Sequence, residues 1–291
     1  MRSLLKNTLP RPVTRALAGT ENYGRRMASW LRVLRDVRGL TPADAAILRC
    51  SAVRAPWDAL SELGQWREPQ LVEDAEIDVR GLGRFAVRGK SDDLGQVLPA
   101  THALLFSTIT GCLSPGDIAI DAGANIGAVS VFMAKAVTPT GRVIAVEMMP
   151  DTAIRLRHNL ALSGLDWVEV VENALSDRAG ETVVAEVVDG LFGQASIAPG
   201  SNPGRQVRRA EVKTTTLDGV TAGMKRIAVL KLDLEGAEPL ALAGAGETLK
   251  RTGAVVFESW SGVASDAAGL LVDAGFAVSN IDGRNFLALR T

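Results

Sequence analysis

The sequence predicts an α/β fold, in which a mostly parallel sheet is covered by helices on both faces. Two observations predict it. From residue 118 onward, short apolar runs alternate with segments of helical length, which is the pattern of strands buried by crossover helices. In addition, the first of these runs leads directly into a glycine-containing loop and then a helix, as in nucleotide-binding sheets.

The N-terminal quarter predicts a helical extension over residues 1–72, ahead of a larger domain over residues 73–291. Helical patches in the extension are expected to break at Pro10, Pro12, Gly19, Pro42, Pro56 and Pro69. One helix is expected to start with Thr41 as its cap and Pro42 as its first residue. A hairpin of Ile77–Val79 and Phe85–Val87 should follow, and then a helix from His102 to Cys112.

The strands of the main sheet can be read in order. We expect them at Ile118–Ile120, Val143–Val146, Trp167–Val171, Ile227–Leu232 and Ala254–Glu258, closed by an antiparallel pair, Phe276–Ile281 and Phe286–Leu289. Helices should begin near Ile126, Pro150 and Gly236, and another should end at Ala274. Two alternating segments, Glu181–Val188 and Val207–Thr215, bracket a run rich in Gly, Ser, Pro and Asn from Asp189 to Gly204. That run predicts a loop, either a flap over a substrate or a disordered segment.

Composition limits the classes of function. The chain has 291 residues, of which 47% are hydrophobic, 22% charged and only 4% aromatic. Few rings argue against a carbohydrate-stacking or single-strand nucleic-acid module. The first 38 residues carry +7, which leaves −8 for the rest and disfavours nucleic acid as a partner. The basic arm is either a solvated helical face or a contact for an acidic partner or membrane surface.

Neither a secretory signal nor a membrane-spanning run is evident. Prolines and arginines interrupt the N-terminal segment, and no apolar stretch has the length of a membrane span. The expected location is therefore the cytoplasm, with no integral membrane association.

The loop after the first strand of the main sheet points to a nucleotide-like ligand. It reads Asp121-Ala-Gly-Ala-Asn-Ile-Gly127, and its two glycines allow a tight turn and a close approach of ligand to backbone. Glu147 ends the second strand, where an acid can accept hydrogen bonds from both hydroxyls of a ribose. A pyrophosphate would be repelled by Asp121, whereas an ammonium or sulfonium would be attracted. These signs favour S-adenosylmethionine over NAD.

Several segments together resemble the FkbM-type family of S-adenosylmethionine-dependent O-methyltransferases. They occur in the family's order and cover roughly residues 115–260: Asp121–Gly127; Gly141–Glu147 with Pro150; His158–Leu160; Asn173–Ser176; Thr216–Asp218; and Lys231–Gly236 with Glu238. Met148-Met149 departs from the family, which usually has one residue fewer before the proline. Residues 1–72 show no such resemblance.

The resemblance implies a class I methyltransferase fold, a Rossmann-like sheet of seven strands with the last one antiparallel. It also implies S-adenosylmethionine as cofactor and methyl transfer to a hydroxyl of a small molecule or sugar. The predicted cofactor set comprises Asp121, Gly123, Asn125 and Gly127 at the methionine end, Glu147 at the ribose, Asn173 and Ala174 at the adenine, and the adjoining Ala124 and Met148.

Candidate catalytic residues follow the fourth strand of the sheet. Asp233 and Glu235 emerge at the carboxyl edge, where an acid can take a proton from an alcohol, orient it, or bind the cofactor amine. With Glu238 they offer three carboxylates for a divalent cation, but acids at this position also cap the following helix, and no metal site is predicted.

His102 is a further candidate for the base, because it lies on the helix before the first strand of the main sheet. Glu258 and Trp260, near the end of the fifth strand, are candidates for the acceptor pocket. Two alternatives remain open: an NAD-dependent oxidoreductase, and a non-catalytic partner protein with a methyltransferase fold. Against the first, Asn125 replaces the middle glycine of the dinucleotide fingerprint.

Overall fold

The computed structural model describes residues 11–61, 67–198 and 204–291, and the side chains of residues 11–18 lie outside this description. The chain forms two compact units. The first comprises residues 1–80 and 86–98, and the second residues 81–85 and 99–291. The division expected after residue 72 stays a prediction, as does the role of the basic arm, whose first ten residues lie outside the description.

The first unit contains two long helices, α2 (Arg11–Asp36) and α3 (Pro42–Ser61). Thr41 caps α3 as predicted: its hydroxyl accepts from the backbone N–H of Asp44, whose carboxylate accepts from the N–H of Thr41. Gly19 and Pro56 were expected to break helices, and that expectation is wrong. Both lie inside these helices, where a lost hydrogen bond or extra backbone entropy is tolerated.

The N-terminal part of the chain also holds β-structure. Strands β1 (Val37–Gly39), β2 (Ala75–Val79) and β3 (Gly83–Val87) form a three-stranded sheet, and β2 and β3 contain the residues of the predicted hairpin. The short helix α4 (Asp93–Gln96) begins at Asp93, a fully buried acid in an ion pair with Arg88.

The second unit is built on a seven-stranded sheet in the order β13-β14-β12-β11-β4-β5-β6. Its strands are β4 (Ile118–Ala122), β5 (Arg142–Val146), β6 (Glu169–Val171), β11 (Ile227–Leu232), β12 (Thr252–Glu258), β13 (Phe276–Asn280) and β14 (Asn285–Arg290). The first five are parallel, and β14 is antiparallel to both of its neighbours, as predicted. Because the chain leaves β4 toward β5 and later returns to β11, the crevice for a ligand is expected at the carboxyl ends of β4 and β11.

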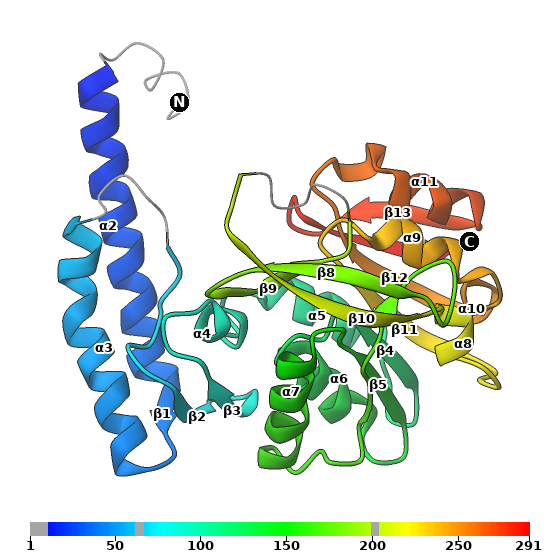
Figure 1. The fold of residues 1–291 in the computed structure, drawn as a ribbon, viewed down its shortest axis with the longest axis horizontal. Coiled ribbons are helices and arrows are strands. Elements are labelled where there is room, and N and C mark those ends of the chain that lie inside the picture. Colours follow the sequence, from blue (N-terminus) through cyan, green and yellow to red (C-terminus); the bar gives the residue numbers. More distant parts are fainter. Residues whose placement is uncertain (1–10, 62–66, 199–203) are drawn as a thin grey trace. The chain divides into compact units, whose positions relative to one another are not determined.

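Helices cover both faces of this sheet. The helices are α5 (Ala103–Gly111), α6 (Ala128–Val137), α7 (Pro150–Leu162), α8 (Leu217–Val220), α9 (Glu238–Ala243), α10 (Gly246–Arg251) and α11 (Asp266–Asp273), with a 3-10 turn at Gly262–Ala264. Leu242 of α9 and Leu271 of α11 join the buried core against Leu230 and Phe257 of the sheet. Figure 1 shows α6 and α7 on the other side of these strands. The apolar runs of the strands are therefore buried on both faces, which fixes the positions of their polar ends.

A second, four-stranded sheet lies between β6 and β11 in the sequence. It has the order β7-β10-β8-β9, with β7 (Ala174–Leu175), β8 (Thr182–Val188), β9 (Leu191–Ser196) and β10 (Val207–Thr215). The expectation of a loop throughout 189–204 is wrong for β9, which pairs antiparallel with β8. Residues 199–203 lie outside the description. The strand forms because β8 offers it an edge and its apolar side chains pack on Ala185 and Val187.

Within the described parts of the chain, no helix combines the length and the apolar character that crossing a membrane requires.

Candidate functional site

A pocket of about 490 Å³ opens at the carboxyl ends of β4, β5 and β11, where the strand order reverses. Six residues of the predicted cofactor set line it: Gly123, Asn125, Glu147, Met148, Asn173 and Ala174. Asp233 also lines it, as do Phe192, Gly193, Ala195 and Ile197 of β9 and its end. The four-stranded sheet thus supplies an apolar wall that sequence patterns did not predict.

The glycine loop is shaped by close backbone approach. Gly123 has φ +81°, and a Cβ there would lie 1.9 Å from the carbonyl oxygen of Asp233. A Cβ on Gly127, with φ +97°, would lie 2.6 Å from a methyl group of Leu156. Only glycine fits both positions, since other residues are strained in this region and have no room. Ala124 is buried, and its N–H donates to the carbonyl of Val146. Ala124 and Gly127 therefore shape the loop without lining the pocket.

Glu147 is held in place by the backbone. One carboxylate oxygen accepts from the N–H of Asn125 at 2.9 Å, and the other from the N–H of Met149 at 2.8 Å. The residue is 7% exposed. Because the backbone engages both of its oxygens, the carboxylate of Glu147 has a fixed orientation in the wall of the pocket.

Asp121 lies beside Lys231 and not in the pocket lining. The residue is fully buried, accepts from Ser130 Oγ at 2.5 Å, and lies 3.4 Å from Lys231 Nζ. Adjacent parallel strands place the two side by side, since Lys231 and Asp121 are register partners of β11 and β4. Lys231 Nζ also donates to the carbonyl of Gly123 and lies 3.3 Å from Asp233. Asp233, and not Asp121, therefore puts negative charge at the pocket.

The charges of Lys231 and Asp233 stabilise each other, whereas at Asp121 burial outweighs the charge of Lys231 and raises the pKa of that acid. Burial alone would lower the pKa of Lys231, but the carboxylates of Asp233 and Asp121 outweigh it and raise the pKa. Burial alone would raise the pKa of Asp233. The charge of Lys231 and hydrogen bonds with Glu258 and Lys231 outweigh it, so that this pKa is lowered. Asp233 is consequently an ionised, partly exposed acid, with 38% of its side chain accessible.

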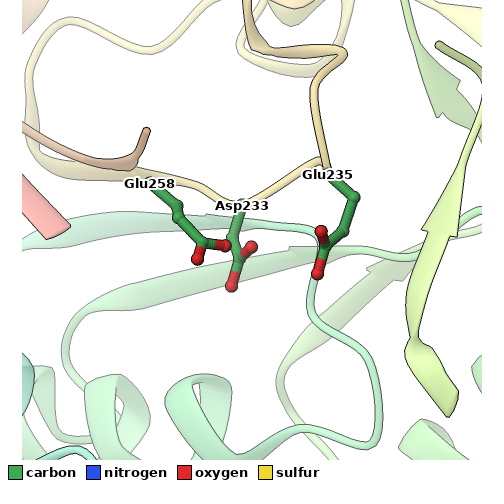
Figure 2. Close-up of side chains that lie close together, drawn as sticks. All are labelled: Asp233, Glu235 and Glu258. Atoms are coloured by element: carbon green, nitrogen blue, oxygen red, sulfur yellow. The ribbon is translucent and has the colours of Figure 1, made fainter. Parts of the chain in front are cut away.

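Three carboxyl groups converge at the ends of β11 and β12. Oxygen atoms of Asp233, Glu235 and Glu258 lie within 4.8 Å of one another, and Figure 2 shows the three side chains side by side. Burial and the charge of Asp233 raise the pKa of Glu235 to about 7. Burial, the charge of Asp233 and a hydrogen bond with it raise the pKa of Glu258 to about 8, against the opposing effect of Arg284.

The grouping of Glu238 with Asp233 and Glu235 is not formed. Glu238 accepts instead from the backbone N–H groups of Leu234 at 2.7 Å and Gly236 at 3.0 Å. It is 5% exposed and lies at the first turn of α9, so it fixes the loop before this helix. Positive charge near the remaining acids comes from Lys231 on one side and from Arg284 on the other.

The remaining candidates lie around this centre. His102 immediately precedes α5 without a capping hydrogen bond from its side chain, its ring lies 5.8 Å from that of Phe106, and its charge helps to lower the pKa of Asp233. Asn173 donates from its side-chain amide to the carbonyl of Lys213 in β10. Trp260 is 72% exposed, and its ring contacts the guanidinium of Arg284.

Sequence patterns assigned no role to Lys231, Arg284 or Phe192. For Lys231 a signal existed: it lies near the end of a strand, two residues before Asp233, a spacing that puts both side chains on the same side of an extended chain. Arg284 and Phe192 gave no comparable signal, because their contacts come from segments far away in the sequence.

The pocket fits S-adenosylmethionine. Asn125 Oδ1 is buried at the glycine loop with no hydrogen-bond partner among the residues that the structure describes, so it offers an acceptor to an amino group. Glu147 offers acceptors to a ribose, and Met148, Leu175 and Phe192 an apolar surface to a base. Sheet order, glycine loop and acid at the end of β5 together define a class I, Rossmann-like methyltransferase.

Comparison with known proteins gives the family. The model of the methyltransferase FkbM domain matches residues 121–273, more than half of the chain. A curated relative, methyltransferase sdnD of Sordaria araneosa, is 31% identical in an alignment of 193 residues that covers 55% of this chain and 73% of that protein. The chain belongs to the FkbM-type family of S-adenosylmethionine-dependent methyltransferases.

Other similarities are shorter or more distant. A protein-L-isoaspartate O-methyltransferase of Aeropyrum pernix is 43% identical over 63 residues, 22% of this chain and 24% of that protein. Among solved structures, an S-adenosylmethionine-dependent O-methyltransferase of Thermotoga maritima matches with TM-score 0.40 and 13% identity, covering 77% of this chain and 79% of that one. Fibrillarin of Aeropyrum pernix with bound S-adenosyl-L-methionine matches with TM-score 0.39 and 12% identity, covering 64% and 73%.

Proposed function

We propose that this protein transfers a methyl group from S-adenosylmethionine to a hydroxyl of a small molecule or sugar. One observation carries the proposal: Glu147, whose carboxylate is oriented by two backbone N–H groups, and Asp233, an ionised acid, line the same pocket. Glu147 suits the ribose of the cofactor. Asp233 suits the reacting groups, because the sulfur of the cofactor carries positive charge and the acceptor hydroxyl must lose a proton.

The cofactor is proposed to lie along the pocket from the glycine loop to β9. Gly123 and Asn125 hold the methionine end, Glu147 accepts from the ribose, and Asn173 and Ala174 border the adenine with Met148. Asp121, Ala124 and Gly127 act through the loop: Asp121 by its ion pair with Lys231, the other two by close packing. Phe192 covers the apolar side of the pocket.

When bound, S-adenosylmethionine supplies a methyl group on a positively charged sulfur. Asp233 attracts that charge and is placed to orient a hydroxyl and take its proton. Glu235 and His102 are proposed to border the acceptor. The charge of His102 lowers the pKa of Asp233, and the charge of Asp233 raises the pKa of Glu235. Alignment of hydroxyl and methyl inside the pocket accounts for much of the acceleration in such displacements.

A hydroxyl acceptor is supported by the end of β11. Asp-Leu-Glu-Gly follows that strand, rather than the Asn/Asp-Pro-Pro-aromatic motif typical of methylation at nucleic-acid amines. Three acids beside the pocket disfavour an anionic group, such as a phosphate, near the methyl.

Calorimetric titration tests the cofactor. S-adenosylhomocysteine is expected to bind and NAD is not, and Glu147→Ala should weaken S-adenosylhomocysteine more than tenfold. That variant loses the ribose contact and leaves two backbone N–H groups without an acceptor, at about 1–3 kcal/mol each. Glu169→Ala is the matched control, because Glu169 lies exposed on β6 in an ion pair with Arg142. Binding of NAD alone would refute the proposal, and no binding of either compound would favour a non-catalytic partner.

Transfer of an isotopically labelled methyl group tests the acceptor. Panels of hydroxylated metabolites and sugars, proteins and nucleic acids should be offered in parallel. Label is expected in an ether that is stable to mild base. Base-labile label would indicate a carboxyl acceptor, and label in nucleic acid would contradict the proposed acceptor class.

A further inference from the structure

We propose that Glu258 is the terminal proton acceptor of the methyl transfer, and that Asp233 passes to it the proton of the acceptor hydroxyl. The inference rests on the proposed function and adds to it a residue, a direction of proton movement and a pH dependence.

The strand order places the two acids in series. Asp233 follows β11 and Glu258 ends β12, and these strands are parallel neighbours with Leu232 paired to Phe257. Asp233 lines the pocket and keeps 38% of its side chain exposed. Glu258 is not among the lining residues and keeps only 12%. Oxygen atoms of their carboxyl groups lie within 4.8 Å of each other. A proton that reaches Asp233 from the pocket therefore has its next acceptor directly behind it.

A cation fixes each end of the pair. Lys231 Nζ lies 3.3 Å from Asp233, and the guanidinium of Arg284 forms an ion pair with Glu258. Arg284 has two further contacts: its guanidinium carbon lies 3.9 Å from the centre of the Trp260 ring, and its backbone N–H donates to the carboxylate of Asp282. Across the sheet, from β4 toward β14, the charged residues follow in the order Asp121, Lys231, Asp233, Glu258 and Arg284. The pair Asp233 and Glu258, placed between two cations, can carry either one or two negative charges. It can therefore take up a proton and release it later.

Glu258 is the more basic of the two acids, as transfer of a proton from Asp233 to Glu258 requires. The pKa of Asp233 is lowered and that of Glu258 is raised to about 8, so the proton comes to rest on Glu258. The other charged groups facing Glu258 agree with this order. Glu235 and Asp233 favour its neutral form, whereas Arg284 holds its ionised form within reach of neutral pH. His102 and Lys231 act on Asp233 and keep it ionised between turnovers.

In the methyl transfer, an oxygen lone pair of the acceptor forms the new O–CH3 bond, the S–CH3 bond breaks, and its electron pair neutralises the sulfonium. In the reactive form both acids are ionised: the O–H proton moves to Asp233 and from there to Glu258, so that Asp233 ends ionised and Glu258 ends neutral. The sulfur loses one positive charge and the acid pair loses one negative charge, so the total charge does not change. Glu258 then releases its proton to solvent before the next turnover.

Glu258→Gln tests the relay, because glutamine keeps the size and the hydrogen bonds but cannot accept a proton. In the wild type, kcat should rise between pH 6 and 8, by up to about tenfold per pH unit, as Glu258 ionises. In the variant, kcat should fall about 100-fold and this rise should vanish, while S-adenosylhomocysteine binds within about twofold of wild type. Glu247→Gln, at an exposed acid of α10, should leave both unchanged. A Glu258→Gln variant with wild-type kcat and pH profile would overturn the proposal.

A second readout needs no turnover. Carboxyl NMR of the cofactor-free protein with ¹³C-labelled glutamate should show one resonance that titrates near pH 8 and is absent in Glu258→Gln. Asp233→Asn should move that titration to lower pH, because it removes the neighbouring negative charge. Titration of Glu258 near 4.5, or no response to Asp233→Asn, would refute the relay. If the protein bound no S-adenosylhomocysteine, the proposed function would fail while this coupling was still measured.

Discussion

Replacing Gly123 by alanine should damage the protein more than a comparable change elsewhere, by an amount that can be worked out. Gly123 has φ +81°, and the left-handed region costs a residue with a Cβ about 1–2 kcal/mol. The new Cβ would also lie 1.9 Å from the carbonyl oxygen of Asp233, and overpacking of a rigid site costs about 1–3 kcal/mol more. The expected loss in free energy of unfolding is therefore about 2–5 kcal/mol.

Gly180→Ala separates the two contributions. Gly180 has φ +84° but nothing within 4 Å of its Cβ position, so only the backbone cost of about 1–2 kcal/mol applies. Urea denaturation followed by tryptophan fluorescence and circular dichroism gives both values. Since the clash displaces the backbone of Asp233, Gly123→Ala should also weaken S-adenosylhomocysteine, and Gly180→Ala should not. Equal destabilisation by the two variants would refute the close approach of loop and strand.

Two further predictions concern charge. The free energy of unfolding should fall as pH rises from about 4.5 to 8, because Glu235 and Glu258 stay protonated in the fold up to about 7 and about 8 but ionise near 4.5 when unfolded. Denaturation midpoints at pH 5 and 8 measure this, and the decline should be smaller in Glu258→Gln. Lys231→Met leaves Asp121 buried without its counter-charge and should cost about 3–5 kcal/mol at pH 7. The exposed Lys135→Met serves as its control, and a loss no larger than the control's would contradict the buried ion pair.

Local sequence patterns predicted the main sheet because each of its strands can be recognised from its own residues. Runs such as Ile227–Leu232 are apolar throughout, and only a strand buried on both faces accommodates them. The loop from Asp121 to Gly127 was likewise readable, since its glycines occupy positions that exclude a Cβ. Glu147 could be placed because an acid that ends a parallel strand must emerge at the carboxyl edge.

Pairing between distant segments decided the rest. Asp121 was expected at the ligand, but the register of β4 and β11 places Lys231 against it and removes it from the pocket lining. The sequence offered Glu238 either as a ligand of a divalent cation or as a helix cap, and Glu258 as a candidate for the acceptor pocket. Backbone N–H groups engage the first, whereas neighbouring strands bring the second to Asp233.

By itself, then, the sequence determined the order of strands and helices along the chain, the glycine loop and the acid at the end of β5, because these follow from periodicity and backbone sterics over a few residues. Only the tertiary structure decided which charges neutralise one another and that β9 forms one wall of the pocket. The reason is physical: burial, ion pairing and strand edges depend on which surfaces meet, and chain segments far apart in the sequence supply them.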